Sequence, residues 1–247
     1  MSNISIELVP RTIEKLEQEM TAINTHFPQI DTINIPDLLR FDVRSWDGCI
    51  RGKHHFKTTI PHIRSMDFDL SESFELGNVL LAESINTVLL VTGDIPQDMS
   101  KRVYNTSCID FIRYFKRQYP AIKVYASIDS YRSGVRQELN YIKQKLDAGA
   151  DGFFTQPFFD LRLLEMYHDQ LSGTDVYWGV SPVLTDGSKN YWEAKNNVVF
   201  PKDFSPSMEW NAQFGRDVLT FARATDQNVY YMPIRADVIA YLQEVLE

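Results

Sequence analysis

The sequence predicts a single (β/α)₈ barrel over residues 1–247, and three observations support this fold class. The length of 247 residues is close to the size of a typical one-domain barrel. Eight short apolar runs have the length and residue types of β-strands. Segments with a helical spacing of apolar residues separate most of these runs, and this alternation is typical of parallel βαβ units.

The predicted strands are short runs rich in β-branched or aromatic residues. They occupy residues 4–9, 32–35, 57–62, 87–92, 123–126, 152–155, 176–180 and 229–232. Eight strands in a chain of this length favour closure into a barrel. An open doubly wound sheet is the alternative, because periodicity does not determine the order of the strands.

The predicted helices place apolar residues three or four positions apart. They occupy residues 12–23, 108–119, 135–148, 161–171, 217–224 and 236–246. Residues 37–52 show no clear pattern, and residues 181–227 lack strand character. Within the second of these segments, residues 186–190 read Asp-Gly-Ser-Lys-Asn, which predicts a loop tip.

Composition and charge exclude several classes of protein. The formal net charge of −8 argues against a general nucleic-acid binder, which needs a basic face. No apolar run approaches the length of a membrane span, and the N-terminus shows no secretory signal, so we expect a cytoplasmic protein. Cys49 and Cys108 have no metal-binding spacing, and we expect neither a disulfide nor a metal site.

Polar residues at the C-terminal ends of the predicted strands are the candidates for chemistry, because barrel enzymes build their active sites there. The candidates are Glu7, His62, Gly93 with Asp94, Tyr125, Gln156 and Arg235. Glu7 interrupts an apolar strand. If Glu7 points into the barrel mouth, burial raises its pKa and makes it a usable general acid. The alternative is an alternating strand in which Glu7 faces solvent.

The other candidates each have a functional and a structural interpretation. Gly93 would let the backbone beside Asp94 approach a ligand, or the pair forms an ordinary turn. The amide of Gln156 can donate to and accept from a heterocycle edge, or it braces a loop. Arg235 would hold an anion or cap the last helix, and His62 would contact a ligand ring or lie satisfied in the core.

Five segments together resemble the catalytic barrel of the methylenetetrahydrofolate reductase family. They are residues 6–11, 61–63, 89–96, 146–160 and 179–183. The most specific stretch is 147–160, where a helix ending in Asp-Ala-Gly-Ala precedes a strand ending in Thr-Gln and then Phe-Phe-Asp. The resemblance is weak over residues 37–52 and 185–206.

The resemblance implies reduction of 5,10-methylenetetrahydrofolate to 5-methyltetrahydrofolate through FAD, with NAD(P)H as the hydride source. Glu7 would protonate the folate nitrogen as the methylene bridge opens, and Asp94 would lie near the flavin and the pterin. Substrate contacts would come from Gln156 at the pterin edge and from Arg235 near the glutamate tail.

The cofactor contacts that the resemblance implies come from His62, Gly93, Asp94, Tyr125 and Lys145. Members of the family commonly form oligomers, so a homo-oligomer is compatible with the resemblance, although no sequence feature fixes a number.

The departures from the family pattern fall on the flavin side of the site. Thr92 stands where the family has an arginine before Gly-Asp. After the fifth strand only Tyr125 survives of a run that lines the FAD phosphate and adenosine region, and Asp129 replaces its histidine. The glycine-rich segment after the second strand is also missing. Three hypotheses therefore stay open: a flavin-dependent reductase, a flavin-free folate reductase or C1-transfer protein, and a non-enzymatic folate-binding partner subunit.

Overall fold

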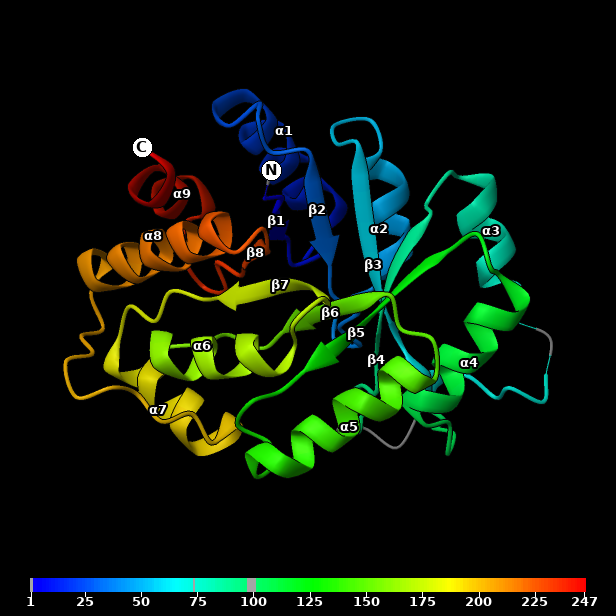
Figure 1. The fold of residues 1–247 in the computed structure, drawn as a ribbon. Helices are drawn as coiled ribbons and strands as arrows, with labels where there is room; N and C mark the ends of the chain where they lie inside the picture. The colour runs from blue at the N-terminus through cyan, green and yellow to red at the C-terminus, as the bar shows by residue number, and fades with distance from the viewer. Residues whose placement is uncertain (1, 73, 97–100) are drawn as a thin grey trace.

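The computed structural model describes residues 2–72, 74–96 and 101–247, and they form a closed parallel barrel surrounded by helices (Figure 1). The eight strands are β1 Ile4–Glu7, β2 Thr32–Ile35, β3 Thr58–Arg64, β4 Thr87–Val91, β5 Lys123–Ile128, β6 Gly152–Thr155, β7 Asp175–Val180 and β8 Asn228–Tyr231. Each strand pairs with its sequence neighbours, and β1 pairs with β8 through Ile4 opposite Val229. The predicted barrel is confirmed, and the open-sheet alternative is wrong.

Two apolar layers explain why the strands read as nearly continuous hydrophobic runs. Alternate strand residues point inward, where Leu89, Phe154 and Tyr177 pack in the centre of the barrel. Their sequence neighbours, such as Leu90 and Trp178, point outward and pack beneath the helices. Both faces of each strand are therefore buried, as expected of a parallel sheet.

The helices cover the outside of the barrel, and α8 and α9 lie beside β1 and β8, where the chain closes (Figure 1). They are α1 Ile13–His26, α2 Ser45–Gly52, α3 Leu76–Ala82, α4 Cys108–Gln118, α5 Val135–Asp147, α6 Leu161–Gln170, α7 Asp186–Asn196, α8 Met208–Ala224 and α9 Val238–Leu246. Six of them begin at a side-chain cap that accepts a first-turn N–H, from Thr12, Ser107, Asp160, Thr185, Ser207 and Asp237.

The segment after β7 differs from the sequence prediction. Residues 186–190 were expected to form a loop tip, but they are the first turn of α7. The hydroxyl of Thr185 caps this helix by accepting from the N–H of Ser188, and Trp192 anchors it by burial. Helix α8 begins at Met208 instead of 217, because the Ser207 side chain caps it there.

The segment 37–52, which shows no clear sequence pattern, contains α2. Its two glycines explain both the weak helical signal and the packing. A Cβ on Gly48 would come within 2.8 Å of the Ile35 side chain, and one on Gly52 within 3.0 Å of Ile33. Helix α2 therefore needs glycine to lie this close to β2, at the cost of its own helix propensity.

Gly152 offers a test of the packing between β5, β6 and β7. A Cβ at Gly152 would lie 2.4 Å from the backbone oxygen of Asp175 and 2.6 Å from the Tyr125 ring. Because backbone cannot move aside cheaply, we expect Gly152→Ala to lower the free energy of unfolding by about 1–3 kcal/mol in a urea titration.

The matched control is Gly187→Ala in the first turn of α7, where the nearest atom would be 4.0 Å away. This control should be neutral or stabilising by up to about 1 kcal/mol, since alanine is the better helix former. Equal stability of the two variants would contradict the packing argument.

Candidate functional site

A pocket of about 640 Å³ opens at the C-terminal ends of β1–β4 and β8, opposite helix α7. Glu7 and Arg64, the last residues of β1 and β3, line the pocket. Asp94 borders it after β4, and Trp192 of α7 forms part of the opposite wall. The volume is in the range of small-molecule sites, and this end of a barrel is where such sites occur.

Glu7 is 9% exposed, and its carboxylate Oε2 accepts a hydrogen bond from the hydroxyl of Tyr230 on β8. Burial raises the pKa of Glu7 to about 7, while the hydrogen bond from Tyr230 acts in the opposite direction. A carboxyl group with such a pKa can hold or release a proton near neutral pH, which is the property of a general acid.

A line of polar side chains continues from Tyr230 across the inside of the barrel. Asn34 of β2 lies beside the Tyr230 hydroxyl, and its Nδ2 is 3.1 Å from Nε2 of His62 on β3. Burial lowers the pKa of His62 to about 3, so the ring is neutral and Nε2 accepts from the amide. Four strands are therefore linked through side chains in the barrel interior.

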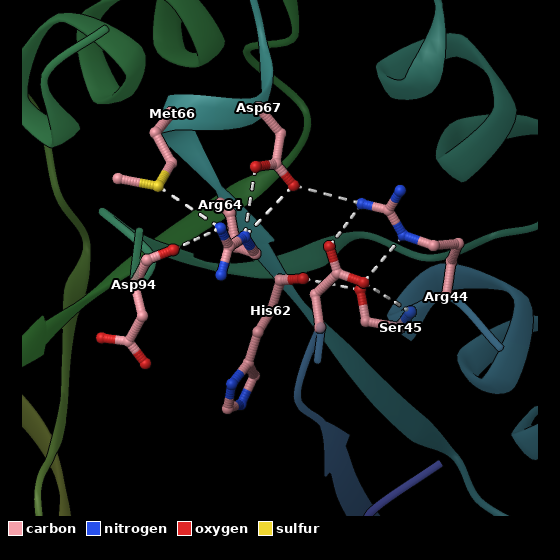
Figure 2. Close-up of polar contacts among 8 residues, drawn as sticks. Arg44, Ser45, His62, Arg64, Met66, Asp67 and Asp94 are labelled. Carbon is pink, nitrogen blue, oxygen red and sulfur yellow. Dashed lines mark hydrogen bonds and ion pairs between the residues drawn. The ribbon is translucent and has the colours of Figure 1, made fainter. Parts of the chain in front are cut away.

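A second polar network lies on the β3 side of the pocket (Figure 2). The Arg64 Nε donates to Asp67 at 3.1–3.2 Å, and its Nη2 donates to the backbone oxygen of Asp94 at 2.7 Å. Asp67 also accepts from Arg44, which forms a second ion pair with the buried carboxylate of Asp37. The network fixes Arg64 and ties the end of β3 to the turn after β4.

Gly93 makes the close contact with Arg64 possible. Its φ of +90° is strained for other residues, and a Cβ would lie 2.9 Å from Cζ of Arg64. The Asp94 side chain that follows is exposed and borders the pocket.

Arg235 lies on the rim after β8, with a φ of +60°. Its guanidinium lies 5.4 Å from the ring centroid of Tyr191 on α7. This contact joins the loop after β8 to the helix that closes the pocket on the opposite side.

Comparison with known proteins decides the family. The family model described as methylenetetrahydrofolate reductase matches residues 52–190, which is more than half of the chain. The chain belongs to the methylenetetrahydrofolate reductase family.

Two 5,10-methylenetetrahydrofolate reductases, from Buchnera aphidicola and Pectobacterium carotovorum, are each 22% identical to the chain, over 150 and 146 residues. The aligned parts cover 59% and 57% of this chain but only 51% and 49% of those proteins. The chain thus spans about half the length of the curated relatives that it matches.

Solved structures agree on the fold. An uncharacterized protein from Clostridium thermocellum, described as binding two copies of 5-methyl-5,6,7,8-tetrahydrofolic acid, has a TM-score of 0.63 and 12% identity over 99% of this chain and 94% of its own. A 2,3-dimethylmalate lyase has a TM-score of 0.59 and 11% identity, over 98% of this chain and 79% of its own.

The structure brings Glu7, Asp94 and Arg235 around one pocket. Gly93 precedes Asp94 without lining the pocket, and the buried His62 ring bonds to Asn34 inside the barrel. Gln156 does not line the described pocket. It is exposed directly after β6, and its backbone N–H donates to the oxygen of Ile128 at 2.7 Å.

Two predicted cofactor contacts of this methylenetetrahydrofolate reductase family member lie elsewhere. The hydroxyl of Tyr125 donates to Asp175 at 2.5 Å and accepts from Lys123, and both partners begin their strands, so the hydroxyl points to the opposite end of the barrel. Lys145 is 1% exposed, and its Nζ donates to the backbone oxygen of Ser127 at 2.5 Å. Burial lowers the pKa of Lys145.

The residues after β5, where the sequence departs from the family pattern, are bonded to the helix that follows them. The fully buried Glu138 accepts from the Asp129 N–H at 3.2 Å and from Arg132 at 2.8 Å, so the loop is bonded to its own helix. Tyr131 packs against an apolar cluster that includes Phe159. Tyr125 and Lys145 likewise bond within the protein, to Asp175 and to the Ser127 oxygen.

Three residues that the sequence did not single out belong to the site: Arg64, Asn34 and Tyr230. Strand periodicity carries a signal for Arg64, because residues two apart face the same side and Arg64 follows His62 by two positions. No comparable signal pairs Tyr230 with Glu7, since their contact depends on closure of the barrel.

Other classes of site find no support in the described part of the chain. Among the residues described, no group of three or more His, Cys, Asp or Glu is placed to hold a metal ion. None of the described helices is long and apolar enough to span a membrane.

The raised pKa of Glu7 predicts a pH-dependent stability. The folded-state pKa of about 7 lies above the ordinary 4.5, so this stabilisation is complete below pH 4.5 and is lost as the pH rises through about 7. Glu7→Gln cannot titrate. Wild type should therefore lose about 3 kcal/mol of unfolding free energy relative to Glu7→Gln between about pH 4 and about pH 9.

Urea titrations at a series of pH values measure this difference. The exposed Glu165→Gln variant is the matched control and should follow the wild-type pH profile. Parallel profiles for wild type and Glu7→Gln would show that Glu7 ionises normally.

Proposed function

We propose that this chain reduces 5,10-methylenetetrahydrofolate to 5-methyltetrahydrofolate, with NAD(P)H as the source of the hydride. One observation carries the proposal: a carboxyl group with a pKa of about 7 lines the pocket of a methylenetetrahydrofolate reductase family barrel. Opening the methylene bridge requires a proton on a folate nitrogen, and Glu7 is the group that can deliver it.

Tyr230 determines which oxygen of Glu7 carries that proton. Because the Tyr230 hydroxyl donates to Oε2, the acidic proton of the neutral carboxyl resides on Oε1. The hydrogen bond also fixes the rotation of the carboxyl group, so the proton is presented in one direction. Tyr230 is thus a positioning residue for the acid.

The remaining pocket residues have roles in binding and in excluding water. Asp94 would accept from the N–H groups of the pterin, and Arg235 would contact the carboxylates of the glutamate tail. The apolar side chains of Leu38, Trp192 and Ile234 line the pocket and keep the reacting carbon away from bulk solvent.

A second candidate is a flavin-free enzyme of the same substrate class, in which a nicotinamide gives its hydride directly to the folate. The observation that favours it is the loop after β5, where the Asp129 backbone N–H and the Arg132 guanidinium both donate to Glu138. FAD remains the expectation from the family resemblance.

The absorption spectrum of the purified protein distinguishes the two candidates. The flavin-free candidate predicts little flavin absorbance near 450 nm (about where oxidised flavins absorb) and no tight binding of added FAD, because Tyr125 and Lys145 are engaged in the barrel and behind β5. Flavin bands that bleach when NADH or NADPH is added would instead establish the flavin-dependent reductase.

The acid role of Glu7 is tested by Glu7→Gln. Turnover of methylenetetrahydrofolate should fall by about 100- to 10,000-fold, since the amide cannot donate the proton, while the dissociation constant of 5-methyltetrahydrofolate changes little. Steady-state kinetics and a fluorescence titration measure the two quantities.

Glu165→Gln should keep full activity, and an active Glu7→Gln enzyme would exclude the acid assignment. A wild-type chain that binds 5-methyltetrahydrofolate without any turnover would favour the non-enzymatic partner subunit.

A further inference from the structure

We propose that Arg64 is a ligand-binding residue of this pocket: its Nη1 donates a hydrogen bond to a ring carbonyl of the bound heterocycle, whose neighbouring ring N–H is accepted by Asp94. The ligand class is a cyclic lactam, that is, a ring in which a carbonyl is bonded to an N–H. The inference deepens the proposed function and rests on it for the identity of the natural ligand.

The first observation is the incomplete bonding of a buried guanidinium. Arg64 is 6% exposed, and its Nε and Nη2 are bonded to Asp67, to the Met66 sulfur and to the oxygen of Asp94. Its Nη1 makes no hydrogen bond to any residue in the described ranges, and Arg64 lines the pocket. Nη1 is not one of the fully buried, unbonded side-chain atoms of the described residues, so it is accessible from the pocket and free to donate to a ligand carbonyl there.

The second observation is rigidity. The ion pair with Asp67 and the hydrogen bond to the Asp94 backbone fix two sides of the guanidinium, while Arg44 holds Asp67 from the far side (Figure 2). The planar guanidinium therefore has one orientation in the absence of ligand. Such a preorganised donor loses little entropy when it binds.

The third observation is the relation between Arg64 and Asp94. Arg64 and Asp94 both line the pocket, and Figure 2 shows the Asp94 side chain turned away from the network that its backbone oxygen joins. A donor and an acceptor in the wall of one pocket match a lactam ring, which presents a carbonyl next to an N–H. A simple anion would not match it, because the Asp94 carboxylate would repel the anion.

Two compounds related to the proposed function carry this edge, namely the pterin of a folate and the isoalloxazine of a flavin. The pterin test compares folic acid with aminopterin, in which an amino group replaces the ring carbonyl. The flavin test uses riboflavin. Dissociation constants are measured by fluorescence titration for wild type and for Arg64→Met, which keeps an unbranched apolar stem without the donors.

The expected result is a loss of discrimination. Wild type should bind folic acid about 10- to 100-fold more tightly than Arg64→Met does, and the preference for folic acid over aminopterin should shrink by a similar factor. A loss of that size for riboflavin alone would also support the lactam contact and would assign it to a flavin.

Arg162→Met is the matched control, because Arg162 is an exposed arginine that pairs with Asp160 and does not line the described pocket. It should keep the wild-type preference. Arg64→Lys serves as a second variant if Arg64→Met does not fold, because its ammonium can still pair with Asp67 but lacks the second donor group that reaches the pocket.

Equal weakening of folic acid and aminopterin, or no change for any of the three compounds, would overturn the inference. The result can be separated from the fate of the proposed function. If the preference for folic acid over aminopterin depends on Arg64 but the protein shows no turnover, the ligand-binding role of Arg64 stands and only the reductase activity is rejected. If turnover depends on Glu7 but ligand binding does not depend on Arg64, the reductase activity stands and the role of Arg64 is rejected.

Discussion

The hydrogen bond from Tyr230 to Glu7 joins the last strand of the barrel to the first, and the chemistry of the pocket depends on it. A carboxyl group inside a barrel must find a donor or lose its charge. Glu7 does both in part. The Tyr230 hydroxyl donates to its Oε2, and burial raises its pKa to about 7, so that it is partly neutral near neutral pH. An acid suited to neutral pH follows from burying a carboxyl group with a single partner.

The same rule accounts for the rest of the polar interior. Asn34 satisfies the neutral His62 ring, and the backbone oxygen of His62 accepts from the Ser45 hydroxyl at 2.6 Å. These bonds run from β1 and β8 through β2 to β3, so the half of the barrel below the pocket is braced by polar contacts. The opposite half is filled by the aromatic rings of Tyr125, Phe154 and Tyr177. The barrel interior therefore has a hydrogen-bonded half beneath the pocket and an aromatic half beside it.

The barrel was predictable from the sequence because its signals are local. Each strand is a short apolar run, because both faces of the sheet are buried. Such a run can be recognised in the sequence without knowing which strands pair with it. The helices were less certain where the chain must pack closely, as in α2, whose glycines at 48 and 52 weaken the helical signal. Asp-Gly-Ser-Lys-Asn at the start of α7 has a turn-like composition and therefore predicts a loop. The cap from Thr185 and the burial of Trp192, which stabilise a helix instead, depend on the folded structure.

The site was predictable only in part, for a geometric reason. The position of a residue along a strand tells which end of the barrel it is near, but not which way a long side chain extends. Tyr125 is the clearest case: it is a strand residue, yet its hydroxyl extends to Asp175 at the start of β7. Lys145 has the same ambiguity, since its ammonium is behind β5 on the Ser127 oxygen. Arg64, in contrast, is held at the pocket by Asp67 three residues on and by the backbone oxygen of Asp94, and the second of these contacts is long-range in sequence.

Charge gives an independent reason to regard this end of the barrel as a binding surface. The chain has 33 acidic and 25 basic residues, so a random patch of its surface would be acidic on average. The residues described around the pocket include Arg40, Lys101 and Arg235 at the rim, as well as the buried Arg64, against the carboxyl groups of Glu7 and Asp94. Because Glu7 is largely neutral below pH 7, Asp94 is the main negative group among them. Arg64 is neutralised by its ion pair with Asp67, so the excess of basic over acidic side chains is at the rim, around a pocket that Glu7 supplies with a proton donor.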